Sequence, residues 1–357
     1  MASIAAPDDR VYANMGLDHV MLYVEDIDAS VEWFTRRVGL HVIAGAWTDR
    51  QHPQVRSVTL GRGQIRLVLA QPLTDDHPGA AYVAVHGDGV ADIALHVGDA
   101  AAAFEEAVSR GAAPVSAPTT DAGVRTATIM GVGDVTHTFV DYGRGGATYA
   151  AGGDVSMRGL STTDHFAVCV EAGQLDPTVA FYEQTLGFTM VFAERIAVGA
   201  QAIQTKAVQS SSGAVTLTLI EPDVSQEPGQ IDQFLKAHGG PGVQHIALAT
   251  DNIVETVTAL RDAGVGFLSA PAAYYTMLAD RLTPARHSRD QLEALSVLVD
   301  QDHDGQLFQI FAKSVHPRNT VFLEIIERLG AHTFGGANIT ALYRAVEMQR
   351  ASQDDGH

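Results

Sequence analysis

The chain has 357 residues, 46% of them hydrophobic and 18% charged, so its composition predicts a globular protein long enough for two domains. The formal net charge of −19 argues against nucleic acid and anionic membranes as partners. No apolar run reaches the ~18 residues that a membrane helix requires, and the first residues lack the pattern of a secretory signal. Cys169 is the only cysteine, which excludes internal disulfides and predicts a cytoplasmic protein.

Two segments of the chain recur later in the sequence. Residues 17–44 are similar to residues 163–193, because both begin with Asp-His in an alternating apolar run and continue through a short helical pattern to a glycine. The segment that begins at Val90 recurs from Val243 in the same order. Each pattern predicts a strand, a helix, a glycine and a second strand.

Residues suited to helix ends mark the predicted helices. Asp176 is placed as an N-cap, Pro177 as the first helical residue and Gly187 as the left-handed residue after the helix. Asn252 and Gly264 bracket a later helix in the same way. The apolar residues of these helices fall on one face, which predicts that the helices pack on a sheet.

Short alternating runs between the helices predict further strands, for example at 215–221 and 306–312. Together with the repeats, they predict an α+β protein of four βαβββ modules. Because the modules recur in pairs, we expect two barrel-like halves, followed by a C-terminal helix.

The glycine-rich stretch 143–159 is the predicted boundary between the halves. Residues 1–155 are expected to form a structural half without metal, and residues 156–357 the catalytic half. The tail helix is expected to begin near Asn338. Its apolar residues fall at helical spacing and are expected to lie over an apolar surface: Ile339, Leu342, Tyr343 and Val346.

Three polar residues of the second half fall at matching strand positions and are separated by almost equal lengths of chain: His165, His245 and Glu324. Glu324 interrupts an apolar strand, and a buried carboxylate without a partner is costly. Two imidazoles and one carboxylate form the facial arrangement that Fe(II) oxygenases use. We therefore interpret the trio as a metal site rather than as three hydrogen-bonded core residues. Small residues expected on the same face leave space for a metal and a ligand: Ala167, Cys169, Ala247 and Ala249.

The repeat alignment gives the first half its own trio, with His19 opposite His165, Asp92 opposite His245 and Asp141 opposite Glu324. Its members are separated by shorter and unequal lengths of chain. We interpret this trio as a decayed copy that has only a structural role.

The four-module plan resembles the vicinal-oxygen-chelate superfamily. Within it, most of residues 160–349 is similar to 4-hydroxyphenylpyruvate dioxygenases and 4-hydroxymandelate synthases, through TDHFAVCV, GGPGVQHIALAT, FLSAPAAYY, LVDQDHDGQLFQIFAK, VFLEIIERLG and FGGANITALYRAVE. The resemblance implies a non-haem Fe(II) dioxygenase with ligands His165, His245 and Glu324. It also implies 4-hydroxyphenylpyruvate and O2 as substrates, and a homodimer.

The resemblance further implies residues that contact the substrate. Gln244 and Gln309 would reach toward it, Phe334 would pack on its ring, and the tail helix would gate the cavity. The alternative for each glutamine is an amide at the surface or at a strand edge, and the tail helix can simply cover core. Thr205, on an expected inner strand, can replace a missing hydrogen-bonding anchor, although a solvent-facing threonine is an alternative.

Two departures from the dioxygenase pattern bear on the product. Where those enzymes read Pro-Ile-Asn-Glu-Pro, this chain has Thr218 and Ile220 in place of the proline and the amide. Where they read Gly-Asn-Phe, it reads Ala337-Asn338-Ile339, so an aliphatic side chain replaces an aromatic one. These substitutions resemble 4-hydroxymandelate synthases, in which the benzylic carbon is hydroxylated.

The sequence thus favours a 4-hydroxymandelate synthase of secondary metabolism, in a route to hydroxyphenylglycine and the antibiotics that contain it. A dioxygenase that forms homogentisate is the main alternative. A binding protein on the same fold without redox chemistry is an alternative of another class, and extradiol ring cleavage is a weaker one.

Overall fold

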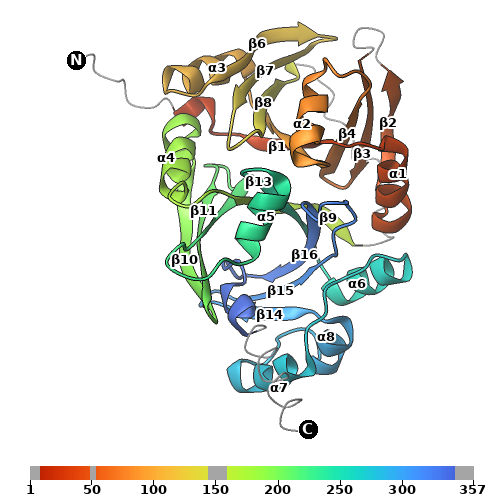
Figure 1. Ribbon diagram of the computed structural model, residues 1–357, viewed down its shortest axis with the longest axis vertical. Coiled ribbons are helices and arrows are strands. Elements are labelled where there is room, and N and C mark those ends of the chain that lie inside the picture. Colours follow the sequence, from red (N-terminus) through yellow and green to blue (C-terminus); the bar gives the residue numbers. More distant parts are fainter. Residues whose placement is uncertain (1–8, 49–53, 144–158, 342–357) are drawn as a thin grey trace, which may run out of the picture.

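The computed structural model describes residues 9–48, 54–143 and 159–341, which form two eight-stranded sheets, one in each half of the chain (Figure 1). The first sheet has the order β2-β3-β4-β1-β5-β8-β7-β6. Its strands are β1 (Gly16–Tyr23), β2 (His41–Thr48), β3 (Val55–Arg62), β4 (Ile65–Pro72), β5 (Gly89–His96), β6 (Pro114–Asp121), β7 (Val124–Met130) and β8 (Thr136–Asp141). Its helical segments are η1 (Asp9–Val11), α1 (Ile27–Glu32), η2 (Trp33–Val38), α2 (Pro78–His86) and α3 (Ala100–Ser109).

The second sheet repeats this order eight strands later, as β10-β11-β12-β9-β13-β16-β15-β14. Its strands are β9 (Leu160–Cys169), β10 (Thr189–Val198), β11 (Gln201–Gln209), β12 (Thr216–Pro222), β13 (Gly242–Thr250), β14 (Leu298–Gln301), β15 (Gln306–Phe311) and β16 (Phe322–Leu329). The helices are α4 (Leu175–Leu186), α5 (Gln230–His238), α6 (Ile253–Asp262), α7 (Ala272–Arg281) and α8 (Arg289–Leu295). The identical order confirms the predicted α+β fold of four βαβββ modules.

The two modules of each half join through one antiparallel pair, β1 with β5 and β9 with β13. Parallel pairs flank this seam, β4 with β1 and β5 with β8 in the first sheet, and β12 with β9 and β13 with β16 in the second. The strands at the centre of each sheet therefore come from both modules. A side chain on any of these central strands can meet side chains that are far away in sequence.

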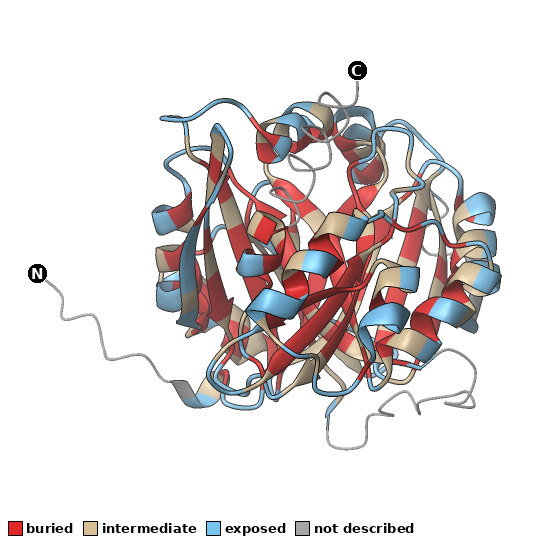
Figure 2. Ribbon diagram, turned by 90° about the horizontal axis from the view of Figure 1, so that it is seen from below, coloured by how far each residue is buried: buried red, intermediate tan, exposed pale blue. Residues whose placement is uncertain are grey.

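Buried residues follow the strands and the inner faces of the helices, whereas the outer helix faces are exposed (Figure 2). In α6, Val257 and Leu260 are buried at the predicted helical spacing. Burying a side chain of this size stabilises the fold by about 1.5–3 kcal/mol. One-sided burial of this kind holds the helices on the outside of the sheets and leaves the other sheet face for the site.

The ends of α4 differ in part from the prediction. The helix begins at Leu175, so Asp176 lies inside its first turn and is not the N-cap. The carboxylate of Glu221 on β12 instead accepts hydrogen bonds from the backbone N–H groups of Gly173 and Leu175, each at 2.9 Å. This cap comes from a distant strand, and sequence spacing does not reveal it. Gly187 follows the helix in the left-handed region, with φ of 64°, as predicted.

The two halves meet through buried polar contacts. The ring nitrogen Nε2 of His137 on β8 lies 2.9 Å from the hydroxyl of Tyr182 on α4. The rings of His86 on α2 and His238 on α5 stack with centroids 4.3 Å apart. The predicted boundary region falls between β8 and β9, and residues 144–158 lie outside the described part of the chain.

The segment after β16 becomes helical at residue 336 and is described to residue 341. The predicted tail helix therefore begins two residues before Asn338. Its expected apolar residues Leu342, Tyr343 and Val346 lie outside the described residues. Within the described ranges, no helix combines the length and the apolar character that a membrane crossing needs.

Candidate metal centre

His165, His245 and Glu324 lie on three neighbouring strands, β9, β13 and β16. Ala247 on the middle strand is directly opposite both His165 and Glu324. His245 precedes Ala247 by two residues, so its side chain leaves the same face of the sheet. The sheet register therefore brings the three side chains to one point, although they are far apart in sequence.

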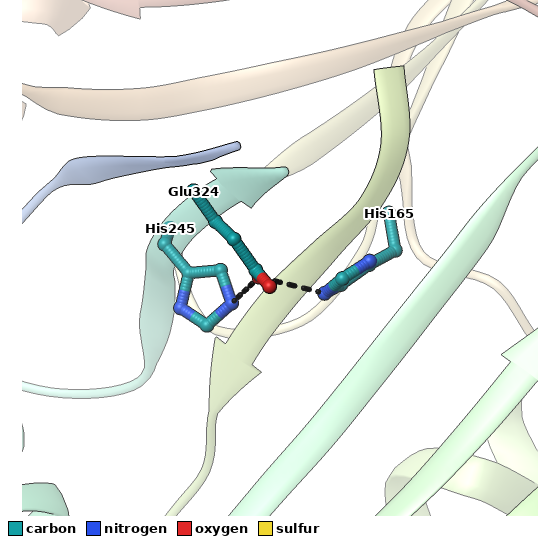
Figure 3. A group of neighbouring side chains, drawn as sticks. All are labelled: His165, His245 and Glu324. Atoms are coloured by element: carbon teal, nitrogen blue, oxygen red, sulfur yellow. Dashed lines mark ion pairs between the residues drawn. The ribbon is translucent and has the colours of Figure 1, made fainter. Parts of the chain in front are cut away.

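The carboxylate of Glu324 lies between the two imidazole rings (Figure 3). Its Oε2 atom is 3.4 Å from Nε2 of His165 and 3.1 Å from Nε2 of His245. All three side chains are buried, and their donor atoms lie within 4.8 Å of one another. The arrangement offers two nitrogen donors and one carboxylate oxygen to a single metal ion.

The other ring nitrogen of each histidine is held by the residue that precedes it. Nδ1 of His165 lies 2.8 Å from Oδ1 of Asp164, and Nδ1 of His245 lies 3.3 Å from Oε1 of Gln244. Because a carboxylate and an amide oxygen only accept, each Nδ1 carries the proton and each Nε2 presents its lone pair to the site. Partners of this kind fix the tautomer and the orientation of metal-binding histidines.

Burial and mutual contact shift the titration of the triad. Burial lowers the pKa of His165, but its hydrogen bonds with Asp164 and Glu324 outweigh burial and raise the pKa to about 9. Burial raises the pKa of Glu324, but the two imidazoles lower it to about 2. Burial lowers the pKa of His245. Without a metal, the carboxylates of Asp164 and Glu324 therefore favour a proton on His165, which a metal ion would displace.

Aromatic rings surround the two imidazoles. The ring of His245 stacks on Phe322 with centroids 5.1 Å apart and meets Phe311 edge-on at 5.7 Å. Phe334 meets His165 edge-on at 5.2 Å and also contacts Phe192 of β10 at 5.3 Å. Phe334, predicted from the resemblance to pack on a substrate ring, thus lies directly beside the triad.

The predicted small residues do lie around the triad. Ala167 is opposite His245, and Ala167, Cys169 and Ala247 are fully buried. Thr218 and Ile220 of β12 are opposite Ala167 and Cys169, so they share this face of the sheet. The face is therefore lined by small side chains at its centre.

Thr218 and Ile220 of β12, which lie beyond the small residues on this face, both contact other parts of the protein. The hydroxyl of Thr218 donates to the backbone oxygen of Phe166 at 3.2 Å. Ile220 packs on a cluster that includes Phe234 of α5. Thr205 on β11 is buried and lies opposite Ile220, so the predicted inner position of Thr205 fits the register.

Two predicted substrate contacts carry buried polar atoms that have no hydrogen-bond partner within the described part of the chain. These are Oε1 of Gln309 and Nδ2 of Asn338. The Oδ1 atom of Asn338 accepts from the hydroxyl of Tyr274 at 2.7 Å, which fixes its amide. Ile339 follows in the same helical turn and is half-buried. A buried polar atom without a partner is costly, so such atoms are candidates for ligand contact.

The first half does not form an equivalent triad, and one prediction about it is wrong. The register pairs His19 with Ala94 as it pairs His165 with Ala247. On the next strand, Leu95 pairs with Phe139 in the first sheet, as Leu248 pairs with Ile325 in the second. The position equivalent to Glu324 is therefore residue 138, a threonine, and Asp141 lies three residues beyond it. The alignment failed because it matched carboxylates without strand pairing to fix the register.

The aligned positions of the first half are joined by hydrogen bonds instead. The hydroxyl of Thr138 donates to Oδ1 of Asp92 at 2.9 Å, and Thr136 donates to the same oxygen at 2.6 Å. Asp141 accepts from the backbone N–H of Gly143. Among the described residues, no group of metal-binding side chains includes His19, Asp92 or Asp141.

Two residues of the site were not predicted. Asp164 orients His165, and Arg328 pairs with both oxygens of Asp164 at 2.8 and 2.9 Å. A signal for Asp164 is present in the repeat, because Asp-His opens both β1 and β9. Arg328 carries no such signal, because its partner precedes it by more than one hundred residues.

The chain matches known proteins over nearly its full length. A family model of the Glyoxalase/Bleomycin resistance protein/Dioxygenase superfamily matches residues 162–310, and a second model of that superfamily matches residues 18–128. The 4-hydroxyphenylpyruvate dioxygenase of Dictyostelium discoideum is 33% identical, with 95% of this chain and 99% of that protein covered. The one of Yarrowia lipolytica is 31% identical, with 95% and 93% covered.

A solved structure of a triple mutant of 4-hydroxymandelate synthase from Streptomyces coelicolor is 39% identical. It aligns with a TM-score of 0.83 and covers 94% of this chain and 98% of that one. These matches confirm the vicinal-oxygen-chelate fold and the dioxygenase resemblance. The chain belongs to the glyoxalase/bleomycin resistance protein/dioxygenase superfamily, in the family that holds the 4-hydroxyphenylpyruvate dioxygenases and 4-hydroxymandelate synthase.

Proposed function

We propose that the protein is an Fe(II)-dependent dioxygenase that converts 4-hydroxyphenylpyruvate and O2 into 4-hydroxymandelate and CO2. The observation that carries the proposal is the convergence of His165, His245 and Glu324 on one point of the second sheet. The names of the relatives support the substrate, because they are dioxygenases of 4-hydroxyphenylpyruvate and a synthase of 4-hydroxymandelate.

The donor set fits a ferrous ion. Two neutral imidazoles and one carboxylate occupy one side of an octahedral ion and leave positions for ligands on the other. Asp164 and Gln244 engage the Nδ1 atoms, so both Nε2 atoms remain for the ion. Bound there, Fe(II) would supply the activation of O2 and the oxidative decarboxylation of the keto acid.

The residues of the site set its charge. A divalent ion with the single carboxylate of Glu324 has a local charge of about +1. This charge attracts the anionic keto acid into a protein whose net charge is −19. Arg328 adds little to the attraction, because both of its contacts with Asp164 neutralise it.

Gln309, Asn338 and Phe334 are assigned to substrate binding. The unpartnered Oε1 of Gln309 and Nδ2 of Asn338 offer one acceptor and one donor on neighbouring segments. Gly335 packs against the amide of Gln309, where a Cβ atom would lie 2.1 Å from Oε1. A side chain at residue 335 would therefore displace the amide of Gln309. Glycine at this position lets the backbone of residue 335 pack directly against that amide. Phe334 supplies an aromatic surface beside His165.

The choice of product rests on the wall that faces the substrate. Ile220 packs with Phe234 and Cys169, so this wall offers apolar contacts where the dioxygenase pattern has an amide. Ile339 leaves more room than a phenylalanine for the ring to rotate. In the proposed reaction the benzylic CH2 loses a hydrogen atom and gains a hydroxyl, while the carboxyl group leaves as CO2. One oxygen atom of O2 enters the hydroxyl, and the other enters the new carboxylate.

A homogentisate-forming dioxygenase is the second candidate, because two relatives named 4-hydroxyphenylpyruvate dioxygenase are 33% and 31% identical. It uses the same substrate and ligands but hydroxylates the aromatic ring, whereas the proposed reaction hydroxylates the benzylic carbon of the side chain. A non-catalytic binding protein is the third candidate. The resemblance also leads us to expect a cytoplasmic homodimer that serves secondary metabolism, in a route to hydroxyphenylglycine.

Product analysis tests the proposal. Purified protein is incubated with Fe(II), ascorbate and 4-hydroxyphenylpyruvate, and O2 uptake is followed. The two candidate products are isomers, so they are separated by chromatography against standards before mass spectrometry. We expect 4-hydroxymandelate, and no turnover by His245→Ala. Homogentisate as the main product would overturn the product assignment, and O2 uptake that survives His245→Ala would overturn the metal site.

A further inference from the structure

Arg328 on β16 binds two parts of the site at once, Asp164 on β9 and the loop that follows β16. Its Nε and Nη2 atoms donate to the two carboxylate oxygens of Asp164, at 2.8 and 2.9 Å. Its Nη1 atom donates to the backbone oxygens of Ala331 and Thr333, at 3.1 and 2.7 Å. The planar guanidinium therefore binds a carboxylate on one edge and a loop on the other.

The carboxylate side of this contact reaches the metal centre. Asp164 lies 2.8 Å from Nδ1 of His165, so the position of its carboxylate sets the orientation of the imidazole. The other ring nitrogen, Nε2, faces Glu324. The two hydrogen bonds from Arg328 fix the plane of the Asp164 carboxylate, and with it the direction of the imidazole.

The loop side of the contact reaches the aromatic wall. Ala331 and Thr333 immediately precede Phe334, and the guanidinium of Arg328 also lies over the ring of Phe334, 5.0 Å from its centroid. The same ring meets His165 edge-on at 5.2 Å. Arg328, Asp164, His165 and Phe334 thus form a closed circuit in which each member contacts the next.

The first half provides an internal comparison, because Tyr142 holds the position equivalent to Arg328. Its hydroxyl donates to Oδ2 of Asp18 at 2.8 Å, and Oδ1 of Asp18 lies 2.7 Å from Nδ1 of His19. The Asp-His pair is therefore supported in both halves. A single hydroxyl proton, however, can hold only one acceptor, whereas arginine can hold the carboxylate and a loop together.

We infer that Arg328 is a positioning residue that makes the orientation of His165 depend on the position of the loop carrying Phe334. When the loop lies as in this structure, Arg328 contacts both Asp164 and Phe334, and each of these contacts the imidazole of His165. When the loop moves, both restraints on His165 weaken together. The inference rests on the proposed function, since it assigns Arg328 a role at the proposed metal site.

The test compares Arg328→Met and Arg328→Lys with Tyr142→Phe, the matched change in the first half. Met keeps much of the stem without hydrogen bonds, and Lys keeps the charge without the planar pair of donors. Co(II) binding and the visible spectrum of the Co(II) protein report ligand geometry without any turnover. The ratio of O2 consumed to product formed, kcat and KM are measured separately.

We expect Arg328→Met to bind Co(II) about 10- to 100-fold more weakly, with an altered spectrum and more O2 consumed per product. Arg328→Lys should lie between this variant and the wild type, and Tyr142→Phe should match the wild type. A normal Co(II) affinity and spectrum in both Arg328 variants would overturn the inference, even if their thermal stability fell. If Arg328→Met does not fold, Arg328→Lys decides alone.

A second comparison tests the coupling to the loop. If the circuit acts as a unit, Phe334→Leu and Arg328→Lys perturb the Co(II) spectrum in the same sense, and their effects on Co(II) affinity do not multiply in the double variant. Independent, multiplying effects would refute the coupling. If the wild-type protein consumes no O2 with the keto acid, the proposed function fails, but the Co(II) measurements still decide the role of Arg328.

Discussion

Thr138 lies in the first sheet at the position that Glu324 holds in the second. Its hydroxyl donates to Asp92, so the first half closes this position with a hydrogen bond instead of offering a carboxylate to a metal. A neutral hydroxyl is a poor ligand for a divalent cation compared with a carboxylate. This difference predicts one metal ion per chain, bound by the second half.

The prediction is tested by the metal content of variants after loading with Fe(II) or Co(II) and removal of excess. His245→Ala should lower the affinity at least 100-fold, because it removes one of three protein ligands. His19→Ala, the matched change in the first half, should leave one metal per chain and normal turnover. A metal content that falls in His19→Ala would contradict the assignment.

We expect the metal site to require a small side chain at residue 247. Ala247 is fully buried and directly opposite both His165 and Glu324, so a larger side chain would enter the space between the ligands. Ala247→Leu should abolish metal binding and turnover. Ala94 is the equivalent residue opposite His19 and is also fully buried.

Ala94→Leu serves as the control for Ala247→Leu. Both changes overpack a buried strand and should destabilise the fold by about 1–3 kcal/mol. Only Ala247→Leu should lose the metal, as measured by calorimetric titration with Co(II) beside a thermal melt. Equal loss of metal in both variants would mean that the effect is general destabilisation and not obstruction of the site.

The parts of the molecule that could be predicted from sequence are those with a local or repeated pattern. The module order, the convergence of His165, His245 and Glu324, and the glycine at the end of α4 follow from the repeats and from helix-end chemistry. The N-cap prediction at Asp176 failed because Glu221, on another strand, caps the helix. Contacts of this kind depend on sheet register, which a single sequence does not fix.

The dependence on sheet register also explains why the alignment of Asp141 was wrong and why Arg328 was not predicted. Asp141 was aligned with Glu324 because it is the only carboxylate in its strand, and strand pairing was needed to find Thr138. Arg328 was missed because its partner Asp164 lies on β9, at the opposite end of the second half in sequence. The repeat predicts which residue types recur, but only the folded sheet shows which of them face one another.

Gln309 and Gln306 lie three residues apart on β15, and we expect their replacement by leucine to have opposite effects on stability and on KM. Oε1 of Gln309 has no partner in the described part of the chain. The amide of Gln306 accepts from the N–H of Ala285 at 2.7 Å and donates to Thr283 and Gln301, each at 2.9 Å.

Gln309→Leu should therefore keep or increase the melting temperature, because it removes a buried polar atom that is not satisfied. It should raise KM for the keto acid about 10-fold, by the loss of roughly 1.4 kcal/mol of binding. Gln306→Leu should lower stability by about 1–3 kcal/mol and leave KM unchanged in the folded fraction. Steady-state kinetics beside thermal melts check both, and the reverse pattern would show that Gln309 is structural.

Ile339→Phe is expected to shift the product from 4-hydroxymandelate toward homogentisate. A phenylalanine there fills the space in which the ring can rotate, and a displacement of order 1 Å changes the rate of a step ~100-fold. The product ratio is measured by chromatography under single-turnover conditions. Ile339→Leu is the control of similar volume and should keep the wild-type ratio. An unchanged ratio in Ile339→Phe would refute the steric account of product choice.

The contact of His137 with Tyr182, which joins the two halves, leads us to expect that the folded protein loses stability at acid pH. His137 is buried, with Nδ1 facing the backbone oxygen of Ile93 and Nε2 facing the hydroxyl of Tyr182. Burial lowers the pKa of His137 to about 4, whereas an unfolded histidine titrates near 6.5. Between these values the unfolded chain binds one more proton than the folded chain. Stability is therefore full above about pH 6.5 and falls with decreasing pH by up to about 1.4 kcal/mol per unit until about pH 4.

His137→Asn isolates this contribution. The asparagine amide can still donate to Ile93 but does not titrate, so the variant should be less stable than the wild type at pH 7. Its deficit should shrink by more than half at pH 5, where the wild type has lost much of the stability that depends on neutral His137. Melting temperatures across this range measure the effect, with exposed His303→Asn as the control whose profile should match the wild type. Parallel profiles for His137→Asn and the wild type would show that His137 does not resist protonation in the folded protein and is not a source of acid sensitivity at the contact between the halves.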